Sequence, residues 1–190
     1  LTCDDELGSF GAKHIAEQGM SCDIPRQVII GEPTSLQVVR LHKGHLSMRI
    51  AIEGVSAHTG SPHLGKNAAV AGGSVIASLT ELAASLAQER SESSEYFTEL
   101  TGFPVLTVAT IQSGTAINVV PDECIIGLGL RLLPDQDQKV IIRRIRDVIA
   151  RSCSLPWDLT ILGDNPTMLT SPTVPVNRWL CEHLHQSESI

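Results

Sequence analysis

Alternation between apolar and polar positions is clearest between residues 46 and 52. The apolar side chains occupy every second position there: Leu46, Met48, Ile50 and Ile52. A period of two is typical of a β-strand that turns one face into a core. Weaker extended patterns cover residues 105–111, 124–132 and 157–162. Four strands are therefore predicted within one continuous part of the chain.

Two longer stretches of the same part have helical spacing. Residues 67–90 are rich in alanine, with Leu79, Leu82 and Leu86 on one side. Residues 137–152 repeat apolar side chains at intervals of three or four, which indicates an amphipathic helix. The resulting order is strand, helix, strand, strand, helix, strand. This order predicts the split βαβ, ferredoxin-like fold: a four-stranded antiparallel sheet with two helices on one face.

The flanking residues have a different pattern. Residues 10–19 predict a short helix that ends at Gly19, residues 28–30 a short buried strand, and residues 38–41 another extended piece. The chain also stops just past a predicted helix, after residues 183–187. These elements are typical of an α/β domain of which only part is present, so we expect a segment of a longer protein.

The expected organisation is an α/β catalytic domain interrupted by an inserted α+β domain. Turn-rich sequence at Lys43-Gly44 and at residues 163–166 marks the two boundaries. We therefore assign residues 1–43 to the partial catalytic domain, residues 44–163 to the inserted domain, and residues 164–190 to the return into the first domain.

Composition narrows the class of protein. Apolar residues make up 42% of the 190 residues but aromatics only 3%, so the core is expected to be aliphatic. The net charge of −7 and the lack of a dense Lys/Arg cluster speak against nucleic acid as a partner. No apolar run approaches the roughly 20 residues that span a bilayer, and the first residues do not resemble a signal peptide.

Five cysteines are scattered singly, without a Cys-x-x-Cys pair. Their odd number and irregular spacing predict free thiols in a reducing compartment, and hence a cytoplasmic protein. The same spacing makes a cysteine-based zinc site improbable.

Carboxylates gather at two places near the start of the chain. Asp4, Asp5 and Glu6 are adjacent, and Glu32 precedes Pro33, which holds the backbone extended. One βα unit separates the two places, so they are expected at the ends of neighbouring strands, where an α/β enzyme gathers metal ligands. Each place has a simpler interpretation on its own: an acidic helix start favoured by the helix dipole, and an ordinary turn.

Five ordered segments resemble the co-catalytic zinc aminoacylase/carboxypeptidase family, and in particular its acetylornithine deacetylases. They are Thr2-Cys3-Asp4-Asp5-Glu6-Leu7-Gly8-Ser9, Ile30-Gly31-Glu32-Pro33-Thr34, His42-Lys43-Gly44-His45, Gly54-Val55-Ser56-Ala57-His58 with Pro62, Gly65 and Asn67, and Gly114-Thr115-Ala116-Ile117-Asn118 with Leu130-Arg131. The matches extend over nearly the whole chain in the family's order.

The resemblance implies a metal centre with two zinc ions, or with cobalt in their place. Glu6 would bind one ion and Glu32 the other, and the pair of ions would activate a bridging water. Asp5 stands where the family has its general base, a Glu. The family's remaining ligands, a His-x-Asp pair and a bridging Asp upstream and a His downstream, are absent from these residues.

The resemblance also assigns three residues of the inserted domain. His58 would reach across a dimer interface and donate to the oxyanion of the tetrahedral intermediate. Asn118 would donate to the same oxyanion or to the substrate amide, and Arg131 would bind the substrate's α-carboxylate. Without the motifs, the three would be interpreted as a loop histidine, a turn asparagine and an arginine on an exposed strand.

The implied protein is a cytoplasmic homodimer, joined through the inserted domain. It would be a metal-dependent amidohydrolase that removes an N-acyl group, such as acetyl, from a small-molecule substrate such as N-acetylornithine, a reaction of arginine biosynthesis. Asp5 in place of Glu and the absent ligands favour a second hypothesis, a catalytically silent module that self-associates. A desuccinylase or carboxypeptidase of the same family is a third.

Overall fold

The computed structural model describes residues 10–18, 27–97 and 101–186. The chain divides into two compact units, residues 42–168 and residues 1–41 with 169–190. Each unit is described by itself below.

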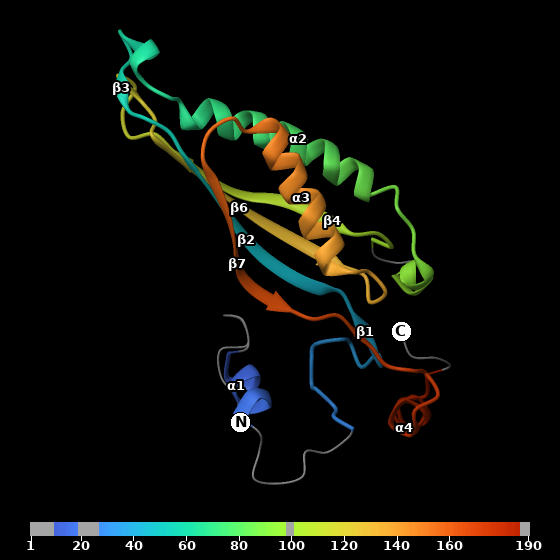
Figure 1. Ribbon diagram of the computed structural model, residues 1–190. Helices are drawn as coiled ribbons and strands as arrows, with labels where there is room; N and C mark the ends of the chain where they lie inside the picture. The colour runs from blue at the N-terminus through green and yellow to red at the C-terminus, as the bar shows by residue number, and fades with distance from the viewer. Residues whose placement is uncertain (1–9, 19–26, 98–100, 187–190) are drawn as a thin grey trace. The chain divides into compact units, whose positions relative to one another are not determined.

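The unit of residues 42–168 is built on a four-stranded antiparallel sheet (Figure 1). In spatial order its strands are β4 (Val105–Ser113), β6 (Glu123–Leu132), β2 (Gly44–Glu53) and β7 (Trp157–Asn165). Helices α2 (Ala68–Leu86) and α3 (Gln138–Ser152) cover one face of the sheet. The ferredoxin-like prediction is confirmed.

The core lies between this sheet and the two helices. Alternate residues of β2, namely Leu46, Met48, Ile50 and Ile52, are almost fully buried, as the period of two predicts. They pack against the buried side of α2, represented by Val75 and Leu79, and of α3, represented by Ile145 and Ile149. Each such aliphatic side chain contributes about 1.5–3 kcal/mol when it leaves water, so the aliphatic core expected from the composition holds the layers together.

Both helices begin at residues that cap them. The side-chain oxygen of Asn67 accepts a hydrogen bond from the Val70 amide at 3.1 Å, and Asp137 accepts one from the Lys139 amide at 2.8 Å. Such caps satisfy amides that the first helical turn leaves without a partner.

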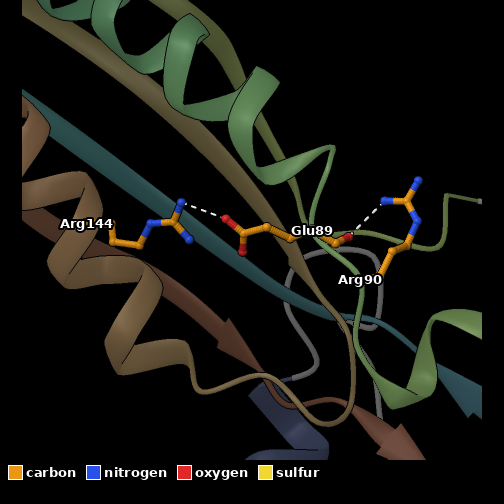
Figure 2. Close-up of polar contacts among 3 residues, drawn as sticks. All are labelled: Glu89, Arg90 and Arg144. Carbon is orange, nitrogen blue, oxygen red and sulfur yellow. Dashed lines mark hydrogen bonds and ion pairs between the residues drawn. The ribbon is translucent and has the colours of Figure 1, made fainter.

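An ion pair joins α3 to the segment that follows α2. Figure 2 shows Arg144 of α3 beside Glu89, with 2.7 Å between Nη2 and Oε1, while Arg90 donates to the Glu89 carbonyl at 2.8 Å. Both side chains of the pair are about one third exposed, which limits its contribution to stability.

Helix α2 is long and apolar enough to cross a membrane by length and composition, which the sequence interpretation did not expect. The core helix of a globular domain meets the same two criteria. Six residues of α2 on the side of the sheet are buried: Ala68, Gly72, Val75, Leu79, Leu82 and Leu86.

The face of the sheet opposite the helices, here called the open face, has short side chains. Ser47, Ala51, Gly127 and Gly129 alternate with the buried positions of β2 and β6 and are partly accessible. Arg49 and Arg131 are the exposed cations of this face on the same two strands. The helices therefore leave one side of the sheet uncovered by this unit.

Short elements extend the unit at both ends of the sheet. At one end, β3 (Ala57–His58) pairs with β5 (Val119–Val120) and is followed by the 3₁₀ turn η2 (Pro62–Leu64). At the other end, β1 (Leu41–His42) pairs with β8 (Met168–Leu169). The 3₁₀ helix η3 (Glu92–Phe97) lies where only a loop was expected.

The second unit confirms two predictions and corrects a third. Helices α1 (Phe10–Gln18) and α4 (Pro175–His183) form where helices were predicted. The predicted buried strand at residues 28–30 is wrong, because these residues are not in a strand and their side chains are 58–70% exposed. A buried strand needs hydrogen-bonded neighbours and covered faces, and the described residues provide neither for residues 28–30.

The extended segment at residues 38–41 is confirmed only at its end, where Leu41 enters β1. Val38 and Arg40 are nevertheless buried, with the Val38 amide donating to Gln186 Oε1 at 3.0 Å and Arg40 Nη1 donating to the Thr170 carbonyl at 3.0 Å. These side-chain hydrogen bonds, together with one from the Thr170 amide to the Arg40 carbonyl at 2.8 Å, position this segment.

The cysteines that the structure describes are free, as expected. Cys124 and Cys153 are buried and Cys181 is partly buried, whereas Cys3 and Cys22 lie outside the described residues. Burial is the largest influence on the Cys124 thiol and raises its pKa. It therefore behaves as a small apolar core residue and not as a nucleophile.

Candidate functional site

His58 and Asn118 are brought together by the β3–β5 pair. His58 lies opposite Val119 in the ladder, and the amide of Thr59 donates to the Asn118 carbonyl at 3.0 Å. Both side chains are exposed. In Figure 1 this pair of short strands lies at the end of the sheet away from β1. Two residues about sixty positions apart thus lie close together at this end of the sheet.

A backbone contact sets the state of the His58 ring. The amide of Gly60 donates a hydrogen bond to His58 Nδ1 at 3.0 Å. A ring nitrogen that accepts a hydrogen bond carries no proton, so the neutral ring carries its proton on Nε2. A Cβ atom on residue 60 would lie 3.2 Å from Nδ1, so glycine leaves room for the contact. Nδ1 of His58 is therefore occupied as an acceptor, which leaves Nε2 as the ring nitrogen that can donate to an oxyanion.

Close backbone contacts position the loop that carries His58. Val55 and Lys66 exchange two hydrogen bonds of 2.9 and 2.8 Å, and the amide of Gly54 donates to the Asp122 carbonyl at 2.7 Å. A Cβ at Gly54 would lie 2.2 Å from the Lys66 carbonyl oxygen, and one at Gly65 would lie 2.8 Å from the Val55 oxygen. Glycines at these two positions are thus required by the packing of the loop.

Arg131 lies at the other end of the sheet. It is opposite His45 of β2 and Val105 of β4. Eight residues of β6 separate it from Glu123, or about 27 Å at roughly 3.4 Å per residue. The guanidinium is exposed and forms no hydrogen bond or ion pair within the described part of the chain. One copy of the chain therefore does not bring Arg131 together with His58 and Asn118.

Two basic side chains lie next to Arg131. Burial lowers the pKa of His45, and the positive charge of Arg131 lowers it further. The same two causes, in the same order, lower the pKa of Lys43. Lys43 Nζ donates to the carbonyl and hydroxyl of Thr101 and to the Phe103 carbonyl, so its ammonium already has partners. The sequence interpretation did not single out His45, whose position opposite Arg131 is visible only in the strand register.

The proposed metal ligands are described only in part. Glu32 is exposed in an irregular segment, where its carbonyl accepts from the Thr34 amide at 2.8 Å. Asp5 and Glu6 lie outside the described residues. Among the residues that the structure describes, no group of three or more His, Cys, Asp or Glu could hold a metal ion. The described residues alone therefore do not fit a two-metal centre.

Comparison with known families identifies the inserted unit. A sequence profile described as the M20 peptidase dimerisation domain matches residues 40–154. The match begins just before β2 and ends just after α3, and it contains His58, Asn118 and Arg131.

Curated relatives extend over the flanking residues as well. An acetylornithine deacetylase from Shigella sonnei is 34% identical over 149 residues, which cover 78% of this chain and 37% of that protein. A probable carboxypeptidase from Paracoccidioides brasiliensis is 31% identical over 157 residues, which cover 80% of this chain and 35% of that protein. The chain thus spans little more than a third of the length of these relatives.

Solved structures share the fold. A tripeptidase from Staphylococcus aureus matches 99% of this chain and 48% of its own, with a TM-score of 0.67 at 17% sequence identity. At this identity the similarity concerns the fold alone.

Proposed function

Because this chain belongs to the M20 peptidase family, we propose that the whole protein is a metal-dependent hydrolase that removes an N-acyl group from an amino acid such as N-acetylornithine. Hydrolysis of an amide is the reaction class common to the named relatives. The acetyl group and ornithine are supported by the similarity to an acetylornithine deacetylase. The unpaired cysteines support a cytoplasmic location.

The observation that carries the proposal is the distribution of three side chains over one domain. His58 and Asn118 form a donor pair at one end of the sheet, and Arg131 is an unpaired cation at the other end. A second copy related by a twofold axis can place its donor pair near the arginine of the first. The active site would then combine Arg131 of one subunit with His58 and Asn118 of the other.

Each of these residues has a defined part in hydrolysis. The guanidinium of Arg131 binds the carboxylate of the amino acid and fixes the scissile amide. Water adds to the amide carbon, and the carbonyl oxygen becomes an oxyanion that accepts from His58 Nε2–H and the Asn118 side chain. The C–N bond then breaks, and the departing nitrogen takes the proton that the water released.

Activation of the water belongs to residues of the other unit. The proposed ligands for zinc or cobalt are Glu6 and Glu32, and the proposed base is Asp5. Carboxylate oxygens are suitable ligands for both ions. Whichever metal is bound, Arg131 would bind the substrate carboxylate, and His58 and Asn118 would stabilise the oxyanion.

The subunit interface is proposed at the edge formed by β4 and α2. Strand β4 has an unpaired edge, and α2 packs over it. The outward residues of α2 are mostly small or neutral: Val70, Gly73, Ser74, Ala77, Thr80, Glu81, Ala84 and Ser85. The opposite edge, formed by β7 and α3, has exposed Asp158, Arg143 and Arg146. Interface centres are depleted in charge, and pairing of edge strands satisfies their amides, so the first edge is favoured.

One feature favours a second candidate function. Asp5 stands where the family has Glu, and the side chain is shorter by one methylene. A displacement near 1 Å can reduce a rate about a hundredfold. A self-associating module without hydrolytic activity would tolerate this change.

Hydrolysis by the full-length protein tests the proposal. We expect release of ornithine from N-acetyl-L-ornithine, loss of activity with a chelator, and recovery with Zn²⁺ or Co²⁺. Parallel assays with N-succinyl-diaminopimelate and dipeptides distinguish the related amide substrates. A protein that dimerises but binds no metal and cleaves none of these compounds would instead be the silent module.

A further inference from the structure

Arg131 and His45 occupy directly opposite positions in the β2–β6 ladder, on the open face of the sheet. A protonated His45 in this position would be repelled by Arg131, because like charges directly opposite each other destabilise a sheet. No acidic side chain forms an ion pair with either residue within the described part of the chain. The sheet thus holds two basic groups together without an anion between them.

The surroundings of this pair provide further donors and space. Ser47 follows His45 on the same face and lies opposite Gly129, while Asn165 of β7 lies on the other side of His45. A Cβ atom added to Gly129 would meet no atom within 4 Å. The Ser47 hydroxyl and the Asn165 amide are therefore close to the two basic groups. Gly129, which has no side chain, leaves open space beside them.

The nearest acid on the neighbouring strand faces the other side of the sheet. Asp164 pairs with the buried Leu46, and its Oδ2 accepts from Gln138 Nε2 of α3 at 2.9 Å. Lys43, which directly precedes the strand of His45, has its ammonium bound to the segment of residues 101–103. The other charged residues on this face of β2 are Arg49, which lies opposite Gly127 and is four residues from His45, and Glu53, which is eight residues away at the far end of the strand. The groups that face His45 are therefore basic or neutral.

We propose that Arg131, His45 and Ser47 together form one carboxylate-binding site on the open face, in which His45 is a specificity-determining residue. This inference rests on the proposed function, because the bound carboxylate is taken to be that of the N-acyl amino acid substrate. Arg131 supplies a permanent bidentate donor pair. His45 adds a second charged donor only when its ring is protonated.

This arrangement couples carboxylate binding to uptake of a proton by His45. In the free protein, burial and the charge of Arg131 lower the pKa of His45, so the ring is neutral at neutral pH. A bound carboxylate attracts the charged ring and offsets the repulsion from Arg131, which raises the pKa. Affinity is then highest below the pKa of the free protein, falls with rising pH between the two values, and is constant above the value of the complex.

The protonation of His45 can be observed directly. We expect an NMR titration of its ring in this chain to give a pKa below the ordinary histidine value, and a higher value with saturating N-acetyl-L-ornithine. The corresponding carboxamide, which has no carboxylate, should cause no shift. A His45 pKa that is the same with and without N-acetyl-L-ornithine would overturn the proposal.

Kinetics of the full-length protein provide the second readout. H45Q retains a neutral donor but cannot be protonated, so we expect KM at low pH to rise about tenfold, the equivalent of 1.4 kcal/mol, with kcat nearly unchanged. The dependence of KM on pH should disappear as well. R49Q removes another cation of the same face and should leave both constants unchanged, so an equal rise in R49Q would contradict a specific site.

The two readouts separate this inference from the proposed function. A ligand-dependent shift of His45 in a protein that does not hydrolyse N-acetyl-L-ornithine would support the carboxylate site and reject the deacylase. Hydrolysis of N-acetyl-L-ornithine by a protein in which the ligand does not shift the His45 pKa would support the deacylase and reject the carboxylate site.

Discussion

At the scale of single residues, His58 shows how one backbone contact determines what a side chain can donate. The motif around it identifies the residue, but the availability of Nε2 as the donor follows from the Gly60 amide, which donates to Nδ1. This hydrogen bond depends on the backbone conformation of residues 58–60. The spacing of residues in the sequence does not reveal that conformation. The same is true of His45, whose relation to Arg131 depends on strand register.

Glutamine and asparagine distinguish the two nitrogens of His58. H58Q places an amide donor near the position of Nε2, whereas H58N places one near Nδ1. We expect the kcat of H58Q to be at least about tenfold higher than that of H58N, since loss of one oxyanion donor lowers kcat by about a hundredfold or more. Steady-state kinetics of the full-length variants measure this difference. Equal activity of the two variants would contradict a role for the Nε2 donor.

Asp135 links stability to pH. Burial opposes its ionisation, but hydrogen bonds from the Ser93 hydroxyl, the Ser91 hydroxyl and the Ser93 amide outweigh burial and lower its pKa. We expect D135N to lower the free energy of unfolding by about 1–2 kcal/mol at pH 7, a value reduced by partial exposure. Urea denaturation measures the change.

The matched control for this change is D137N. Asp137 caps α3, and asparagine is an equally good cap, so the expected change is within about 0.5 kcal/mol. Because the folded pKa of Asp135 is lowered, its contribution is complete above the unfolded value near 4 and is lost as pH falls through the folded value. The difference between wild type and D135N should therefore shrink in acid, and a constant difference would contradict the hydrogen-bond explanation.

At the scale of elements, hydrophobic periodicity predicted the four long strands and both helices of the inserted domain to within a few residues. It succeeds there because each element has one buried face, which imposes the period of its secondary structure. It failed at residues 28–30, where a short apolar run has no period to distinguish a strand from an exposed segment. The short β3–β5 pair was also missed, since two-residue strands contain no repeat.

Helix α2 offers a matched pair of adjacent glycines. A Cβ at Gly72 would lie 2.5 Å from Cys124 Sγ, whereas one at Gly73 would meet nothing within 4 Å. G72A should therefore force α2 away from β6 and lower the free energy of unfolding by about 1–3 kcal/mol. G73A should raise it by up to about 1 kcal/mol, since alanine favours helix. Thermal denaturation tests the opposite signs, and a similar loss in both variants would contradict the close packing.

At the scale of the whole molecule, the composite site could be predicted only through resemblance. No spacing in the sequence indicates that His58 and Asn118 lie at the opposite end of the sheet from Arg131. The chain folds these residues into a single domain and still leaves them apart. In the proposed function, a second subunit would supply what one copy lacks, so dimerisation and catalysis would be coupled.

The proposed interface can be tested by adding charge to α2. Ala77 is exposed on α2, so A77E would place a carboxylate at the centre of the contact between subunits. We expect the dissociation constant of the dimer to rise at least tenfold, as measured by sedimentation equilibrium. A150E makes the same change on the exposed side of α3 and should leave the dimer intact. Weakening by A150E alone would assign the interface to the opposite edge.

The most direct test of the central claim is complementation between two inactive variants. H58A and R131A of the full-length protein are each expected to be nearly inactive as homodimers. Co-expression with different affinity tags yields mixed dimers, each with one intact site that combines His58 of one subunit and Arg131 of the other. We predict that a random mixture recovers about a quarter of wild-type activity. If purified mixed dimers remain as inactive as the parents, the two residues act within one subunit and the shared site is wrong.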